Sequence, residues 1–261
     1  MRGRVGTQLL NQIRPYPGYA SIGDVEDRFT SNYNGLQVSF QRRVSNGAIF
    51  SVNYTYAKAL SNVGTPQNTY DISSEYGPDG NDRTQVFNAN FVYPLPFYKN
   101  QTGIAGRTLG GWEVTGIVSY GSGQFLTAST SSVDPGGLGL LVGPATSRPD
   151  YISNPNSGAP HTIQEWFNTS AFAQVPAGQY RPGNDPASNI RGPGYENWDL
   201  SLFKNFKLER SAVMQLRAES FNAFNHTNFS NVNTTLGSSA YGQVTGAGPA
   251  RVMQLAAKIK F

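Results

Sequence analysis

The sequence of 261 residues contains no cysteine, and this absence excludes several kinds of protein. A disulfide framework, a zinc site with thiolate ligands and a cysteine nucleophile all need the missing side chain. The two histidines, His161 and His226, stand far apart without a second ligand at metal-binding spacing, so they are predicted to be polar loop residues. We therefore expect no metal and no cofactor.

Long apolar runs are also missing. No stretch approaches the roughly 18 apolar residues of a transmembrane helix, and residues 1–10 (MRGRVGTQLL) lack the apolar segment of a secretory signal. If the protein is exported, its signal is absent from this sequence. We therefore expect a truncated chain or an internal piece of a longer protein.

Charge is scarce as well. Charged residues make up 14% of the chain, against roughly 25% in ordinary soluble domains. The net charge of +4 is spread along the chain without runs of like charge, so no nucleic-acid partner is predicted. No phosphate-binding glycine loop and no Gly-x-Ser-x-Gly motif occurs, and we expect the protein not to be an enzyme.

The sequence is rich instead in aromatic residues, at 12%, and in stretches with a period of two. Residues 250–261 (ARVMQLAAKIKF) place one set of alternate residues on a single, mostly apolar face, which includes Met253, Leu255, Ala257, Ile259 and Phe261. The stretch is close to the roughly 9–11 residues that a tilted transmembrane strand needs. A two-faced strand of a soluble β-sandwich has the same period, so this stretch alone leaves both folds open.

Further strands are predicted from the same alternation. They cover residues 31–44, 48–58, 83–93, 112–120, 198–207 and 212–221, which gives about seven strands with the last one. Asn46 and Gly47 between the first two form a tight hairpin turn, because both tolerate positive φ angles.

The connections between these strands alternate in length. Residues 45–47, 95–110 and 208–211 are short or medium, whereas residues 59–82, 121–196 and 222–249 are long. Bacterial outer-membrane barrels alternate short periplasmic turns with long extracellular loops in this way. We therefore expect residues 121–197 at the cell surface, with one helical turn around residues 162–167.

The positions of the aromatic residues favour a sheet that spans a bilayer, because membrane barrels carry aromatic girdles at both interfaces. The girdle is predicted to comprise Phe40, Phe50, Tyr93 and Trp112 at the short-turn end and Tyr56, Phe87, Tyr120 and Trp198 at the long-loop end. The opposite face of the predicted sheet is polar. Its charged residues are candidates for a lumen lining, namely Glu113, Asp199, Arg217, Glu219 and Lys258. Arg217 and Glu219 either line a solute path or brace the wall.

With these strands placed, the chain resembles the C-terminal part of TonB-dependent outer-membrane receptors of the Oar-like group, whose members usually carry a carboxypeptidase-regulatory-like domain. The resemblance covers roughly residues 31–261. It is carried by residues 31–43 (SNYNGLQVSFQRR), 110–116 (GGWEVTG), 166–172 (WFNTSAF), 191–206 (RGPGYENWDLSLFKNF) and 216–225 (LRAESFNAFN).

The resemblance implies partners for the chain. In that family the last strand resembles a signal read by the barrel-assembly machinery, and Met253, Leu255, Ala257, Ile259 and Phe261 fit it. A full receptor resembles a 22-stranded barrel with a plug and a TonB-contacting segment, which are not found in this sequence. Contact with the TonB system would therefore run through missing N-terminal parts, and the substrate is not predicted.

The predicted fold class is all-β: an antiparallel, up-and-down transmembrane β-barrel segment of about 7–8 strands, forming an open curved sheet with long extracellular loops. Residues 1–30 are expected to form a loop or partial hairpin, and residues 31–261 the receptor-like barrel. The expected location is the bacterial outer membrane, in contact with its lipid, with a role in TonB-dependent solute uptake. A non-transporting surface or adhesin-like protein and a secreted carbohydrate-binding sandwich are the alternatives.

Overall fold

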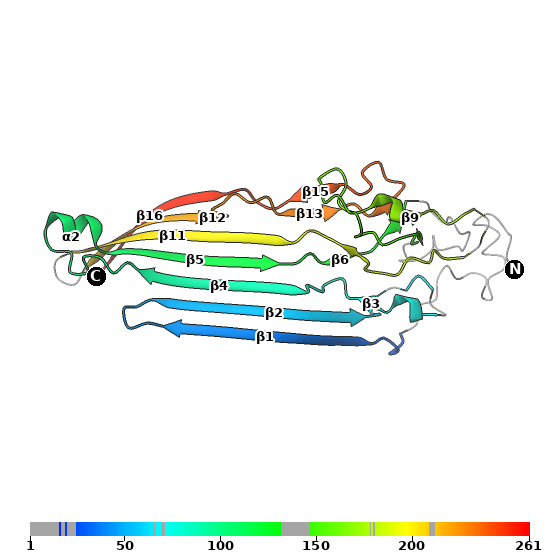
Figure 1. The fold of residues 1–261 in the computed structure, drawn as a ribbon, viewed down its shortest axis with the longest axis horizontal. Helices are drawn as coiled ribbons and strands as arrows, with labels where there is room; N and C mark the ends of the chain where they lie inside the picture. The colour runs from blue at the N-terminus through cyan, green and yellow to red at the C-terminus, as the bar shows by residue number, and fades with distance from the viewer. Residues whose placement is uncertain are drawn as a thin grey trace.

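The computed structural model of the chain describes residues 16, 19, 25–64, 66–68, 71–131, 147–177, 179, 181–208 and 212–261. Their main feature is one long antiparallel sheet, with connections gathered at its two ends (Figure 1). The loop or hairpin expected over residues 1–30 falls almost wholly outside the described residues. No helix in the described part of the chain is long and apolar enough to cross a membrane.

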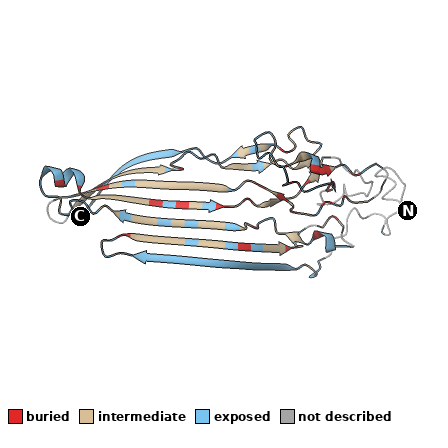
Figure 2. Ribbon diagram, viewed as in Figure 1, coloured by how far each residue is buried: buried red, intermediate tan, exposed pale blue. Residues whose placement is uncertain are grey.

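The sheet has eight strands, seven of them long and in simple sequential order. The long strands are β1 (Ser31–Arg43), β2 (Ile49–Ser61), β4 (Gln85–Pro94), β5 (Trp112–Gly121), β11 (Tyr195–Lys207), β12 (Val213–Phe221) and β16 (Val252–Lys260), and the short β3 (Gly77–Pro78) pairs with β2. β1 and β16 are the two edges and are exposed along their whole length (Figure 2). The predicted all-β class, strand number and up-and-down order are confirmed.

The register keeps the apolar and polar residues of every strand on separate faces. Phe40 lies opposite Val52, Val52 opposite Ala89, and that row of apolar residues continues through Val118 to Trp198. The neighbouring row is polar and runs through Ser39, Asn53, Asn88, Ser119 and Asn197. One face of the sheet is therefore mostly apolar and the other mostly polar; these are called the apolar face and the polar face below.

No second sheet covers the apolar face in the described part of the chain. Leu216 and Leu255, which a sandwich would bury, are 42% and 83% exposed. Phe40 stands near the short-turn end of β1, yet its row reaches Trp198 near the opposite end of β11. The strands are thus staggered, as the inclined strands of a barrel wall require. The arrangement is a barrel-type wall rather than a sandwich.

Glycine is required at one point on the apolar face. The ring of Phe91 lies across Gly116 on the adjacent strand, and a Cβ atom at Gly116 would stand 2.6 Å from that ring and 2.9 Å from Leu200. A larger residue would push these side chains apart. Gly116 therefore fixes the packing of β4, β5 and β11.

The short connections lie at one end of the sheet. The predicted hairpin turn is present, with Gly47 at φ +90° and the Asn46 side chain accepting a hydrogen bond from the Ala48 amide at 3.1 Å. The connection from β4 to β5 contains the helix α2 (Gly103–Leu109), which the sequence did not predict. The helix has only seven residues, two of them glycine, so its sequence shows no helical periodicity of apolar residues.

The long connections lie at the other end and contain further short elements. These are η1 (Ser73–Glu75), β6 (Phe125–Leu126), β7 (Ser129–Thr130), β8 (Asp150–Tyr151), η3 (Thr169–Ala171), β9 (Phe172–Ala173), β10 (Ile190–Arg191), β13 (Phe229–Val232), β14 (Thr235–Leu236) and β15 (Val244–Ala247). The prediction of a helical turn at residues 162–167 was wrong, because these residues form no helix. The turn lies at η3, because the Asn168 side chain accepts from the Ser170 amide and starts it there.

Candidate functional site

The long connections fold together into one body at the end of the sheet. Here the described parts of residues 62–84, 122–194 and 222–251 are called the loop cap. Its hydrophobic core comprises Ala128, Phe167, Ala171, Phe172 and Ile190, with Leu126, Trp166, Val232 and Tyr241 packed against it. The Phe167 ring meets those of Phe172 and Tyr241 edge to face, at centroid distances of 6.0 and 5.5 Å. The loop cap therefore has a core of its own.

Backbone pairing joins segments of the loop cap that are distant in sequence. β6 pairs with β10, β8 with β9 and β13 with β15, all antiparallel, whereas β7 and β14 are parallel. The Trp166 amide donates to the carbonyl oxygen of Gly242 at 2.8 Å, which ties the second long connection to the third. These bonds satisfy backbone groups that would otherwise need water.

A buried ion pair ties the first long connection to the second. The Arg148 guanidinium donates to both carboxylate oxygens of Glu75, at 2.6 and 2.7 Å, and both side chains are less than a tenth exposed. The buried Gln67 joins them: its amide oxygen accepts from the Arg148 backbone and its NH₂ group donates to the Gly183 carbonyl at 2.8 Å. Three segments are thus held by one polar cluster.

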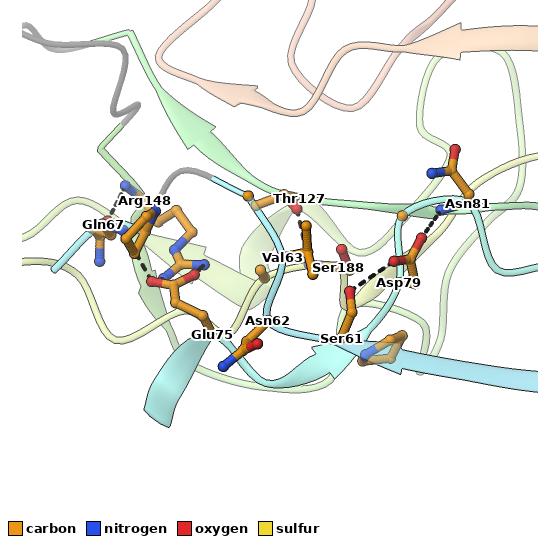
Figure 3. Close-up of a pocket in the computed structure, with 15 residues that line it drawn as sticks. Ser61, Asn62, Val63, Gln67, Glu75, Asp79, Asn81, Thr127, Arg148 and Ser188 are labelled. Atoms are coloured by element: carbon orange, nitrogen blue, oxygen red, sulfur yellow. Dashed lines mark hydrogen bonds and ion pairs between the residues drawn. The ribbon is translucent and has the colours of Figure 1, made fainter. Parts of the chain in front are cut away.

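Beside this cluster lies a polar cavity of about 440 Å³ (Figure 3). Its walls include Ser61, Asn62, Asp79, Asn81, Thr127 and Ser188. The Ser61 hydroxyl donates to Asp79 at 2.7 Å, and the Asn81 amide donates to the same carboxylate at 2.8 Å. These hydrogen bonds lower the pKa of Asp79 and keep it ionised, the backbone bond from Asn81 contributing most. The cavity therefore offers hydroxyl, amide and carboxylate groups.

A second cavity, of about 670 Å³, lies between the second and third connections. Its lining includes Arg83, Tyr195, Phe229 and Asn231, and the Arg83 guanidinium lies 4.9 Å from the centre of the Tyr195 ring. Tyr195 belongs to β11 and Ser61, in the first cavity, to β2. Both residues continue the polar face of their strands, so both cavities adjoin that face.

Two further acids of the loop cap are held differently. Asp150 pairs with Arg181 through two bonds of 2.6 Å, and this hydrogen bonding lowers the pKa of Asp150. Asp185 is only 2% exposed, and burial raises its pKa to about 7 against the opposing effects of Asn189 and Arg148. Burial, followed by the charge of Asp185, also raises the pKa of Tyr241. The described residues contain no group of three or more acids or histidines that could hold a metal.

The five predicted lumen residues, Glu113, Asp199, Arg217, Glu219 and Lys258, all lie on the polar face. Arg217 donates to the amide oxygen of Gln215 at 2.7 Å, and Glu219 accepts from the side chain of Gln254. Asp199 accepts from the backbone amide of Asn222 at 2.9 Å. Amide groups therefore bind Asp199, Arg217 and Glu219, and Arg217 and Glu219 form no ion pair with each other.

The predicted girdle residues all lie on the apolar face: Phe40, Phe50, Tyr56, Phe87, Tyr93, Trp112, Tyr120 and Trp198. Phe50 and Tyr93 meet at 6.3 Å near the short-turn end, and Trp198 meets Phe224 of the loop cap at 5.5 Å near the other end. The apolar residues of the last strand share this face. Phe261 follows β16 and is fully exposed.

Sequence reasoning missed the residues that build the loop cap. Gln67, Glu75, Arg148 and Asp185 come from segments without any periodicity, and nothing in the sequence pairs them. Trp166 and Phe172 were noted as part of a resembling motif, but their place in a core was not predicted. A buried arginine and glutamate become recognisable only when the fold brings their segments together.

The staggered sheet with one apolar and one polar face defines the wall of a β-barrel membrane protein. A family model described as an outer membrane beta barrel domain matches residues 4–254, and the chain belongs to that family. The expected location in the bacterial outer membrane is thereby confirmed. No curated protein and no solved structure matches the chain.

Proposed function

We propose that the chain forms the C-terminal part of an Oar-like, TonB-dependent receptor that takes up a solute. In this proposal the strands provide the wall, the polar face provides the lumen lining, and the loop cap captures the solute at the cell surface. The sequence motifs shared with that group support the proposal. The observation that carries it is that both cavities of the loop cap adjoin the polar face of the sheet.

The proposed path offers polar side chains at each stage from the loop cap inward, although apolar residues such as Ile49 and Ile117 also line its inner part. Ser61 and Asp79 stand in the first cavity, and Asp199 and Glu219 line a hollow of about 440 Å³ on the polar face farther down the wall. A solute with several hydroxyl or amine groups would find hydrogen-bond partners at each stage. The proposed role is binding and passage, with TonB engaged through a segment outside residues 31–261.

The test uses the protein as its natural reading frame encodes it, in its own host. Strains lacking this gene, lacking TonB or lacking both are compared for growth on a panel of scarce solutes. Transport predicts one shared growth defect, no greater in the double mutant than in the strain without TonB. A defect of the gene deletion that persists unchanged in TonB-deficient cells, or that affects surface attachment alone, would favour the non-transporting surface protein instead.

A further inference from the structure

The helix α2 is docked against the apolar face of the sheet rather than extending away from it. The side-chain amide of Gln101, just before the helix, donates to the Asn205 carbonyl at 2.8 Å and accepts from the Lys207 amide at 3.1 Å. The Trp112 indole donates to the Thr108 carbonyl at 3.0 Å. These bonds fix the helix to β5 and β11 at the short-turn end of the sheet (Figure 1).

A lysine of the apolar face secures the same docking. Lys204 lies near the short-turn end of β11, yet it is only 4% exposed. Its ammonium donates to the carbonyl oxygens of Thr108, at 3.0 Å, and Gly110, at the C-terminal end of α2, where the helix dipole favours a cation. The ammonium also lies 5.2 Å from the centre of the Trp112 ring. This charge is therefore satisfied inside the protein.

Between α2 and the sheet lies an open groove of about 480 Å³. Its floor is formed by apolar side chains of three adjacent strands, namely Leu202, Phe206, Leu216, Ala218 and Leu255. Arg107 of α2 stands on its rim and is exposed. None of the described residues forms an ion pair or hydrogen bond with the Arg107 side chain. The groove thus combines an apolar floor with an available guanidinium.

The outward side of this segment is apolar. Ile104 is 88% exposed and Leu109 53%, and Phe97 and Tyr98 just before the helix are more than half exposed. In an outer-membrane barrel the apolar face meets lipid and the short turns lie on the periplasmic side. The groove therefore lies at the boundary between acyl chains and headgroups, where an arginine meets lipid phosphate.

We propose that this groove binds a glycerophospholipid of the periplasmic leaflet. One acyl chain lies along the floor over Leu216 and Ala218, and the phosphate accepts hydrogen bonds from the Arg107 guanidinium. Ile104 and Leu109 enter the adjacent headgroup boundary. A phospholipid matches both parts of the groove, because its phosphate can meet the guanidinium on the rim while its acyl chain covers the apolar floor. The site is independent of whether the protein transports a solute.

The test is retention of phospholipid by the protein purified from outer membranes in mild detergent, measured by native mass spectrometry during stepwise delipidation. The wild-type protein is expected to keep one phospholipid after bulk lipid is gone. Arg107→Ala should lower its retention about tenfold, as expected for the loss of a charge-assisted hydrogen bond. Ala218→Phe, which fills the floor and leaves Arg107 in place, should lower it as well.

Arg42→Ala is the matched control, because Arg42 stands on the same apolar face and at the same end but on the distant strand β1. It should retain lipid as the wild type does. Heat-dependent mobility in electrophoresis shows that each variant is folded. Equal retention in Arg107→Ala and wild type, equal loss in Arg42→Ala, or no lipid retained by the folded wild type would each overturn the proposal.

Discussion

Glu75 and Arg148, 73 positions apart in sequence, form a two-bonded ion pair inside the loop cap, at 2.6 and 2.7 Å. Breaking a buried pair by removing one partner leaves the other charge uncompensated, at a cost of about 3–5 kcal/mol. Glu75→Gln is therefore expected to loosen the loop cap while the sheet stays folded. Faster protease cleavage of the loop cap, with unchanged heat-dependent mobility of the barrel, is the measurement.

Two controls accompany that prediction. Glu75→Gln combined with Arg148→Met removes both charges and should restore much of the protease resistance. Glu26→Gln breaks an exposed pair with Arg28, whose side chains are 44% and 40% exposed, and should change little. Cleavage of Glu75→Gln at the wild-type rate would show that the pair contributes nothing to the loop cap.

The loop cap should lose stability as the pH rises from 3.8 to about 7. Burial raises the pKa of Asp185 from 3.8 to about 7. Between these values the folded state holds a proton that the unfolded state has released, so stability falls with rising pH across this window and levels off above it. Protease cleavage of the loop cap should be slower at pH 5 than at pH 8, after correction for protease activity on an unfolded substrate.

Asp185→Asn, which stays neutral, should abolish that difference and resist cleavage at pH 8 better than the wild type. Asp71→Asn is the control, because Asp71 is an exposed aspartate with a lowered pKa. It should keep the wild-type pH dependence. An unchanged pH dependence in Asp185→Asn would assign the effect to another group.

The absence of cysteine from these 261 residues allows a test of topology, because a single introduced thiol is the only one among them. Ser157 is exposed in the loop cap, and Lys99 is exposed at the short-turn end. A membrane-impermeant maleimide should label Ser157→Cys on intact cells. It should label Lys99→Cys only after the outer membrane has been opened. The reverse pattern would invert the orientation assigned to the sheet.

Replacing Phe261 with Asp should prevent assembly of the natural protein into the membrane. Phe261 is fully exposed and packs against nothing in this sheet, so the loss would reflect recognition by the assembly machinery and contact with the bilayer interface. Ala257→Ser, a small change on the same face, should be much milder. The measure is the amount of folded protein in outer membranes, and normal levels of Phe261→Asp would refute this role.

The sheet was predictable because its signal is local. Alternation within each strand is a property of adjacent residues, so Phe40, Val52 and Ala89 could be assigned to one face before their register was known. Sequential strand order followed from the tight turn at Asn46 and Gly47 and from the alternating lengths of the connections. The predicted lumen and girdle residues consequently fell on the expected faces.

The loop cap and the helix α2 were not predictable from such signals. Ile190 is a single apolar residue among polar ones, and Phe167 lies in a stretch without regular alternation, so only contacts between distant segments show that both are buried. In the sequence, Lys204 is only a single charged residue near the end of a predicted strand. Its carbonyl partners lie in a segment whose helix has too few residues to show a period.

The pairing of β6 with β10 has a consequence for the order of folding. These two short strands continue the β5–β11 pair, and the Gly192 amide donates to Gln124 at 2.8 Å directly beyond it. Closing a long chain segment carries an entropic cost that grows by only about 0.6 kcal/mol per doubling of its length. If the loop cap folds first, this entropy is lost before the strands pair, and the pairing of β6 with β10 places Tyr195 beside Gly121. In kinetic terms, the most distant strand pair of the wall then forms without a further loop-closure step.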